Sequence, residues 1–382
     1  MTAFQIRKPF KPFTISSAFV WLLFWGLFWV EKAEAQSPLV RNFEQIQYQG
    51  TLNGNLPIVM NLTFTEQTAS GHYFYTKYQI PITLEGAKQA NGTWKIEEKD
   101  KSYNTTAFFE GKKVGDKFSG SWRNAAGTKK FAFALTQIKE GIVGFEGYRI
   151  KDEKQDSKGG ISSLAIEVLY PTSIPTDLPT TLLQKLQDSV IVGQLGAEFL
   201  GKDNVAAKLK RLHKGYFEGN TQDDDLDFAL NYTDERSMSV IFNQSHILTL
   251  DYSGYSYAGG AHGTYGTLYQ IWDLKKGKIL HAKDIFVAPQ NPALRQLLVR
   301  QLRKDLALPK EQSLGDYGFF LDKDADLPLP DNMAATGTGI LFLYGLYEIA
   351  PYVMGTTEIF ISYAELKPFM RNDCALWLLA NQ

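Results

Sequence analysis

Residues 251–280 read DYSGYSYAGGAHGTYGTLYQIWDLKKGKIL, and this stretch decides how the second half of the chain folds. Apolar and polar side chains alternate on both sides of a glycine pair, which predicts two antiparallel β-strands joined by a sharp bend. Gly259 and Gly260 permit backbone angles that are closed to other residues. Together with Gly263, in the same bend, and Gly277, in the next turn, they are interpreted as structural glycines.

Four tyrosines of the stretch occupy odd-numbered positions. Side chains alternate between the two faces of a strand, so Tyr255 and Tyr257 are expected on one face before the bend, and Tyr265 and Tyr269 on one face after it. His262 is expected to donate a ring N–H to a backbone carbonyl and so lock the bend. Half-buried tyrosines are ordinary sheet packing, yet they also suit a carbohydrate or protein partner, because rigid contact area combines with a hydroxyl. Both interpretations stay open.

The candidate binding surface joins this stretch to a second one downstream, where Glu348 lies next to a tyrosine and close to a proline. Because glycoside cleavage uses paired carboxyl groups, Glu348 is the first acid to inspect for that chemistry. The surface comprises Tyr255, Tyr257, His262, Tyr265, Tyr347, Glu348 and Tyr352.

Catalysis at His262 lacks a suitable nucleophile. Ser256 lies in Gly-Tyr-Ser-Tyr-Ala, close to the Gly-x-Ser-x-Gly pattern of a nucleophile elbow, but that motif needs a helix after the serine, and Gly-Gly-Ala-His-Gly cannot begin one. No His-x-x-x-His pair occurs that would bind zinc on a helix. Asp322–Asp326 resembles the opening of a calcium loop, but Leu327 and Met333 replace the required glycine and glutamate. No catalytic residue, cofactor or metal site is predicted.

Outward from this stretch, the chain divides into two modules. Residues 161–382 mix strands with helical segments at 177–201 and 291–306, in separate runs that predict an α+β module with an antiparallel sheet. Residues 36–145 alternate throughout and predict an antiparallel β-module, a meander closed as a barrel or a sandwich. The charged segment 146–160 is expected to be a linker.

The N-terminal residues 1–35 have the layout of a secretory signal peptide. Arg7, Lys8 and Lys11 precede the apolar run Ala18–Val30, and Ala33-Glu34-Ala35 follows, so cleavage is expected after Ala35. An uncleaved anchor is the alternative, because extending the run toward Phe13 approaches spanning length. With cleavage, no membrane span remains, and the protein is expected to be secreted or periplasmic.

Composition excludes several classes of function. The 40 basic and 41 acidic residues give a formal net charge of −1, so there is no basic excess to attract nucleic acid or anionic lipid. Cys374 is the single cysteine, which rules out an intramolecular disulfide and metal sites of the Cys-x-x-Cys type.

Several motifs carry a family resemblance over roughly residues 161–370. They are YAGGAHG at 257–263, DLKKGK at 273–278, DIF at 284–286 and YEIAPY at 347–352. In this order they resemble the uncharacterised extracytoplasmic bacterial domain pair found beside peptidoglycan deacetylases of the PdaC type and in the outer part of lysozyme-sensing anti-sigma factors. The deacetylase chemistry resides in another domain, so the resemblance implies an envelope location but does not bring that enzyme activity with it.

These observations predict a secreted cell-envelope protein that acts as a non-catalytic binding module. Its expected ligand is peptidoglycan or another glycan, or a lysozyme-like protein. One alternative is a glycan-active hydrolase or deacetylase, and another is a scaffold for other envelope proteins. Oligomeric state is left open.

Overall fold

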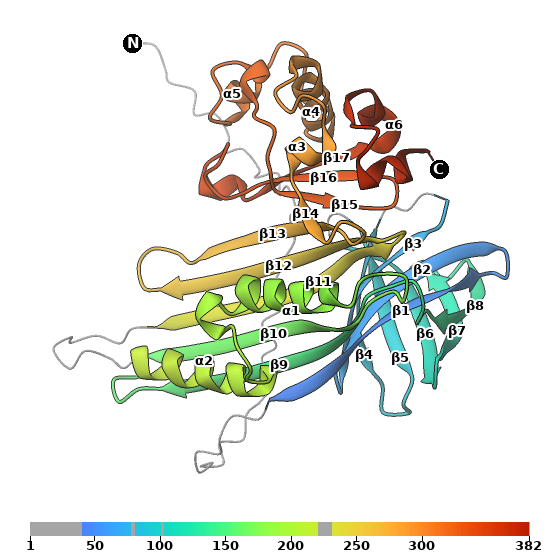
Figure 1. The fold of residues 1–382 in the computed structure, drawn as a ribbon, viewed down its shortest axis with the longest axis vertical. Coiled ribbons are helices and arrows are strands. Elements are labelled where there is room, and N and C mark those ends of the chain that lie inside the picture. Colours follow the sequence, from blue (N-terminus) through green and yellow to red (C-terminus); the bar gives the residue numbers. More distant parts are fainter. Residues whose placement is uncertain (1–39, 78–80, 101–102, 221–230, 382) are drawn as a thin grey trace, which may run out of the picture.

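The computed structural model describes residues 40–77, 81–100, 103–220 and 231–381. Within these ranges one long sheet runs through most of the molecule, and a small sheet packs against it in the C-terminal part (Figure 1). The predicted signal peptide, residues 1–35, lies outside the described residues. No helix in the described ranges combines the length and the apolar character needed to cross a bilayer.

The N-terminal strands form a closed eight-stranded antiparallel barrel. Each strand pairs with the next, and β8 returns to β1 with Tyr48 opposite Gln137 and Leu52 opposite Phe133. The barrel confirms the predicted antiparallel module and selects the barrel over the sandwich. Aromatic side chains, Phe109 and Phe118 among them, fill its interior. The strands are β1 (Arg41–Leu52), β2 (Leu56–Phe64), β3 (Thr68–Tyr75), β4 (Ile82–Lys88), β5 (Trp94–Lys99), β6 (Thr105–Val114), β7 (Lys117–Asn124) and β8 (Lys130–Gln137).

Strand β1 belongs to the barrel and to a second, open part of the same sheet. Its first residues, Arg41–Glu44, pair with the next strand along the chain after β8. The order then continues without a break to the edge at β14. The strands of this part are β9 (Gly144–Gln155), β10 (Ile161–Ser173), β11 (Tyr232–Gln244), β12 (Ile247–Ala258), β13 (Thr264–Asp273) and β14 (Lys278–Leu280).

The linker expected at residues 146–160 is instead most of β9 and the tight turn into β10. Ile161 pairs with Gln155, and the ladder continues to Tyr170 opposite Glu146. The end of β9 is exposed to solvent, so charged residues occupy both of its faces. A strand without alternation carries no pattern that separates it from a loop.

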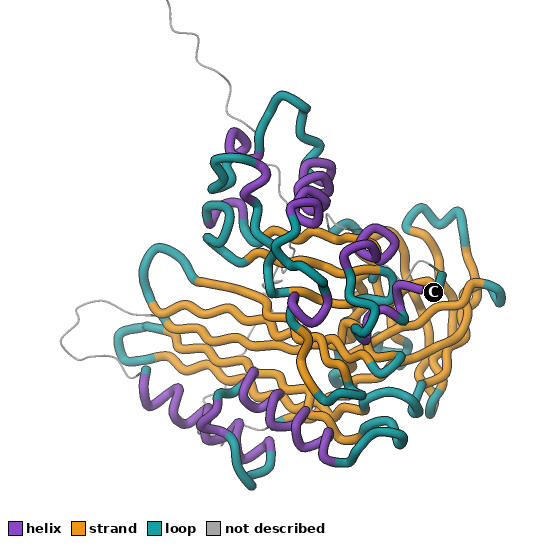
Figure 2. The backbone as a smooth tube through the Cα atoms, turned by 45° about the horizontal axis from the view of Figure 1, so that its top comes forward, coloured by secondary structure: helices purple, strands orange, loops and turns teal. Residues whose placement is uncertain are grey.

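Two helices cover one face of the open sheet and produce its one parallel pairing in the described residues. Helices α1 (Thr181–Gln194) and α2 (Val205–Gly219) cross from β10 to β11, which therefore run parallel. Figure 2 shows these helices on one side of the strands and the C-terminal helices on the other. The α+β prediction is confirmed.

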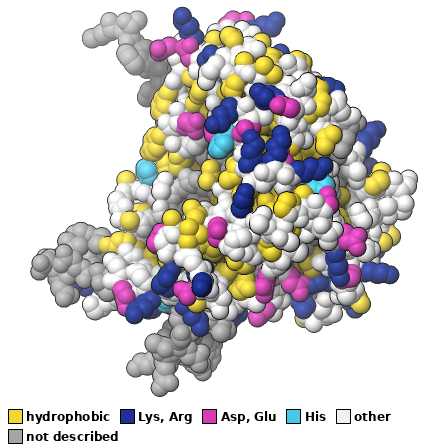
Figure 3. All heavy atoms as spheres, in the orientation of Figure 1, with side chains coloured by type: hydrophobic (Ala, Val, Ile, Leu, Met, Phe, Trp, Pro, Cys, Tyr) yellow, Lys and Arg dark blue, Asp and Glu magenta, His cyan; other side chains and the backbone are white. Residues whose placement is uncertain are grey.

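The C-terminal residues form a small antiparallel sheet with short helices around it. Its hydrophobic core includes Phe286, Leu298 and Phe342, and it is shared with Phe242 and Ile271 of the long sheet. Charged side chains of both signs are interspersed on the face in Figure 3. The elements are α3 (Ala282–Ile285), α4 (Pro292–Asp305), α5 (Leu314–Tyr317), η2 (Asp324–Asp326), β15 (Met333–Ala335), β16 (Gly339–Tyr344), η3 (Tyr352–Met354), β17 (Thr357–Ser362), α6 (Tyr363–Leu366), η4 (Lys367–Phe369), η5 (Ala375–Trp377) and η6 (Leu379–Asn381).

Candidate functional site

The hairpin β12–β13 presents two different faces. The ring of Tyr252 packs on helix α1, where a methyl group added to Gly193 would lie 2.8 Å from it. Even-numbered residues of β12 therefore face the helices, because side chains alternate along a strand. Gly254 lies opposite Gly266 on that face. This helix-facing side carries small residues where the opposite side carries tyrosine rings.

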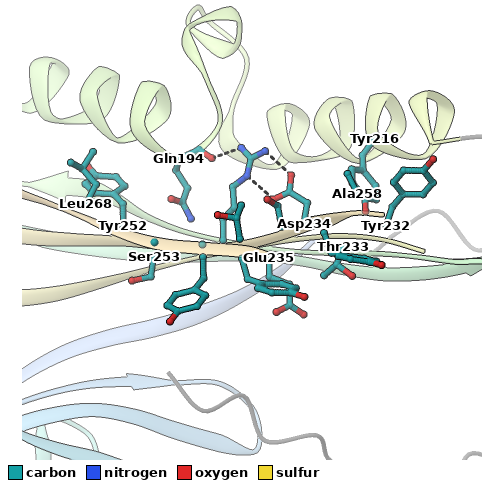
Figure 4. A pocket seen from close by; sticks show the side chains of 18 of the residues that line it. Gln194, Tyr216, Tyr232, Thr233, Asp234, Glu235, Tyr252, Ser253, Ala258 and Leu268 are labelled. Atoms are coloured by element: carbon teal, nitrogen blue, oxygen red, sulfur yellow. Dashed lines mark hydrogen bonds and ion pairs between the residues drawn. The ribbon is translucent and has the colours of Figure 1, made fainter. Parts of the chain in front are cut away.

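A groove of about 640 Å³ lies over the small residues, beyond the end of α1. Figure 4 shows Gln194 and Tyr216 of the helices over the sheet, with Tyr232 and Tyr252 on the strands. Glycine at positions 254 and 266 leaves the floor open, since an added Cβ at Gly266 would meet nothing within 4 Å. The small floor residues are Gly254, Ser256, Ala258, Thr264 and Gly266.

One charged pair is fixed in the groove. The guanidinium of Arg236 donates to both carboxylate oxygens of Asp234, at 2.9 and 2.6 Å, and a third N–H donates to the carbonyl of Gln194 at 2.9 Å. Asp234 and Arg236 are two residues apart on β11, so both project to the same face. A bidentate pair of this kind is rigid and offers neighbouring donors and acceptors to a ligand.

The opposite face carries the predicted aromatic cluster. The His262 imidazole stacks on the Tyr352 ring with centroids 3.9 Å apart and planes 24° apart. Tyr265 meets the same Tyr352 ring edge-on at 6.0 Å, and Tyr347 lies 5.8 Å from it. Thus four residues predicted from two distant stretches come together at the tip of the hairpin.

Several contacts of this cluster hold the bend. His262 Nδ1 lies 2.9 Å from the carbonyl oxygen of Gly263, and the hydroxyl of Tyr352 donates to that oxygen at 2.9 Å. The hydroxyl of Tyr257 donates to the carbonyl of Gly260 at 2.9 Å. Burial raises the pKa of Tyr265, with the neighbouring Tyr352 adding to the effect. These bonds lock the bend, as expected for His262.

The predicted structural glycines occupy positions that need them. Gly259, Gly260 and Gly277 have φ angles of 85°, 96° and 59°, in the left-handed half of the map that side chains disfavour. A Cβ at Gly263 would overlap the ring of Tyr255, with a ring carbon 2.5 Å away. A side chain at position 263 would therefore require the Tyr255 ring to move.

Glu348 supports its own turn. Its carboxylate accepts a hydrogen bond from the Gly345 backbone N–H at 2.7 Å. Tyr347 before it has a φ angle of 62° and is 56% exposed. The hydroxyl of Tyr347 lies 3.4 Å from His262 Nε2. Glu348 is therefore a turn residue beside the aromatic cluster.

Ser256 and His262 do not form a nucleophile and base. Ser256 belongs to the groove floor, on the helix-facing side, opposite Thr264. His262 is exposed and stacks on the other face. At Asp322–Asp326, Asp324 pairs with Arg303 at 2.6 Å. The described residues contain no group of three His, Cys, Asp or Glu side chains placed to hold a metal ion.

The sequence did not predict the groove as a candidate site. Tyr255, Tyr257 and Tyr265 border the groove, although alternation sends their rings to the opposite face. The run of small residues between those tyrosines was the available signal, because it leaves one face without side chains. The groove also uses Gln194, Tyr216, Tyr232, Asp234 and Arg236.

Two family models match this chain in the order of the motifs. The model described as Deacetylase PdaC matches residues 166–265, and the model described as a protein of unknown function, DUF3298, matches residues 283–364. Both matches agree with the pair of domains that the motifs resemble. The first match includes all of α1, α2 and β11 and the hairpin bend of the groove, while the second includes Tyr347, Glu348 and Tyr352. Both domains are associated with cell-envelope proteins, and the first match indicates an extracytoplasmic location.

Solved structures of DUF3298 proteins are similar to this chain. A member from Bacteroides fragilis NCTC 9343 has 23% identity and a TM-score of 0.55, covering 64% of this chain and all of its own. A protein from Pseudomonas aeruginosa PAO1 has 19% identity and a TM-score of 0.36, covering 59% of this chain and 94% of its own. The first similarity supports the fold of the domain pair. No curated protein matches the chain.

Proposed function

We propose that this protein is a non-catalytic binding module of the cell envelope, and that the groove bordered by the end of α1 and by α2 holds a glycan such as a peptidoglycan strand. Cleavage of residues 1–35 after Ala35 would release it as a secreted or periplasmic protein. The observation that carries the proposal is the open floor at Gly254 and Gly266. The groove volume of about 640 Å³ falls within the range of small-ligand pockets, roughly 300–1,000 Å³.

The chemistry of the walls suits sugars. Tyr216 and Tyr232 supply flat apolar area with hydroxyls, the combination that favours recognition of ligands with apolar and polar edges. The Asp234–Arg236 pair offers acceptors beside donors, which matches adjacent sugar hydroxyls. Ser256 on the floor adds a further hydroxyl.

Binding without cleavage is favoured over hydrolysis by the placement of the acids. Glycosidases set two carboxyl groups across the scissile bond. The groove is bordered by Asp234 and Glu235, but they are adjacent on β11 and project from opposite faces. Asp234 is already bonded to Arg236 on both oxygens. Hydrolysis or deacetylation is the alternative, and product formation in a turnover assay would reveal it.

The exposed aromatic cluster favours a second candidate, contact with a lysozyme-like protein. Tyr347 is more than half exposed and stands beside the stacked His262 and Tyr352. Aromatic side chains of this kind anchor protein interfaces. Such a partner would dock on the opposite face of the hairpin from the groove, so the two ligands can be told apart by mutation.

Co-sedimentation with purified sacculi tests the glycan proposal. Gly266→Leu places a side chain in the groove, and we expect binding to fall at least tenfold. Gly215→Leu is the matched control, because Gly215 lies on α2 and also has nothing within 4 Å of an added Cβ. Equal binding by both variants, or none by the wild type, contradicts the proposal. Pull-down with lysozyme, compared with Tyr347→Ala, tests the second candidate.

A further inference from the structure

The side of the groove that faces the helices is electrically balanced. Its ionised side chains in the described residues are Asp234 and Arg236, and each neutralises the other in a bidentate pair. A third guanidinium N–H is bonded to the Gln194 carbonyl. Within the described lining, a charged ligand would therefore lose hydration without finding a free opposite charge, which costs free energy.

Glu235 does not change this balance. It lies opposite Tyr255 on the neighbouring strand, so both project to the face that carries the aromatic cluster. Its neighbour across Ala165 is Lys151, because Ala165 pairs with Lys151 on one side and with Glu235 on the other. Burial raises the pKa of Glu235, and Lys151 opposes that shift. The Glu235 carboxylate and Lys151 thus both lie on the far face of the sheet.

The remaining described residues on the helix-facing side of the groove are uncharged. Tyrosine rings, the Leu268 side chain and the floor glycines provide apolar contact. Ser256, Thr264 and Asn220 provide neutral donors and acceptors. Affinity must then come from ring contact and hydrogen bonds, with little dependence on ionic strength.

We infer that the groove selects the uncharged, N-acetylated amino-sugar backbone of a glycan. It discriminates against a de-N-acetylated strand, which carries ammonium groups, and against an acidic stem peptide. This inference rests on the proposed function and names the ligand class of the same groove. The Asp234–Arg236 pair sets the selectivity, since it cancels the two charges of the helix-facing side.

Calorimetric titration with three probes tests the inference. The probes are an N-acetylglucosamine tetramer, a glucosamine tetramer and a stem tetrapeptide with free carboxylates, each at about 0.05 and 0.5 M NaCl, across the range in which the Debye length falls below about 10 Å. We expect the acetylated tetramer to bind at least tenfold more tightly than the others, with less than a twofold change in affinity between the two salt concentrations. Gly266→Leu should abolish this binding, and Gly215→Leu should retain it.

Asp234→Asn supplies an independent readout, because it leaves Arg236 with an uncompensated charge in the groove. This variant should gain affinity for the stem peptide, and that affinity should fall as salt rises. Tighter binding of the glucosamine tetramer or the stem peptide by the wild type, or a tenfold loss of affinity in salt, overturns the inference. If sacculi bind in a Gly266-dependent manner but the acetylated tetramer does not, the inference fails while the proposed function stands. If neither binds, the proposed function fails as well.

Discussion

Gly254 and Gly266 lie opposite each other across β12 and β13, on the side of the sheet that carries α1. At the same level of the hairpin, Tyr255 lies opposite Tyr265 on the other side. The period of two residues along a strand thus separates an open groove from an aromatic cluster. One hairpin provides both candidate surfaces.

The two glycines at positions 263 and 266 should respond oppositely to the same substitution. Gly263→Ala places a methyl group about 2.5 Å from the tip of the Tyr255 ring, so the ring must move aside, and we expect a loss at the low end of the roughly 1–3 kcal/mol that overpacking costs. Gly266→Ala meets nothing within 4 Å, and it should be neutral or stabilise by roughly 0.5 kcal/mol, because alanine restricts the unfolded chain. Urea unfolding measures both. Equal effects would mean that Gly263 does not pack under Tyr255.

Arg236→Lys should weaken glycan binding about tenfold, the factor that about 1.4 kcal/mol represents. Lysine cannot form the two coplanar hydrogen bonds that the guanidinium donates to Asp234. Because the pair is partly exposed, we expect a loss of only about 1 kcal/mol in stability. Arg211→Lys is the control, since its pairing with Asp203 is at the surface and should leave binding unchanged. Unaltered binding by Arg236→Lys would show that the Asp234–Arg236 pair does not contribute to glycan binding.

The hairpin and its bend could be predicted from the sequence because alternation and glycine pairs act locally. His262 and Tyr265 meet Tyr352, as the candidate surface anticipated. The groove could not be predicted, because Tyr216 and Arg236 reach it only through the α1–α2 crossover and the parallel pairing of β10 with β11. Closure of the barrel likewise depends on β1 and β8, which are far apart in sequence.

Acid should weaken the junction between the barrel and the open sheet through His72. This side chain is fully buried on β3, with Nε2 3.0 Å from the carbonyl oxygen of Ile241 on β11. Burial lowers the pKa of His72 to about 4, so the folded state disfavours protonation. Its stabilising contribution is complete above about pH 6.5 and is lost as the pH falls toward 4, by up to about 3 kcal/mol.

Measuring the free energy of unfolding from pH 7 to pH 4 checks this. His72→Gln should show a shallower loss than the wild type over that range. Identical slopes for the two proteins would show that His72 is not the group that titrates.

Asp251 should make the free energy of unfolding fall as the pH rises, which is the opposite pH dependence to that of His72. It is buried on β12 and accepts from the hydroxyl of Ser253 at 2.6 Å. Burial raises the pKa of Asp251 to about 6, so its contribution is complete below about pH 3.8 and is lost as the pH rises through 6. Asp251→Asn should therefore raise the free energy of unfolding at pH 8, by at most about 3 kcal/mol, and leave it nearly unchanged at pH 4. Asp188→Asn, at the surface, should show no such gain.

The most direct test of the groove is amide chemical-shift mapping of the isotope-labelled protein during titration with an N-acetylglucosamine tetramer. We expect the largest shifts at Gly254, Ser256 and Gly266, and we expect Gly266→Leu to remove them. Shifts confined to His262, Tyr347 and Tyr352, or no shifts at saturating ligand, would contradict the proposal.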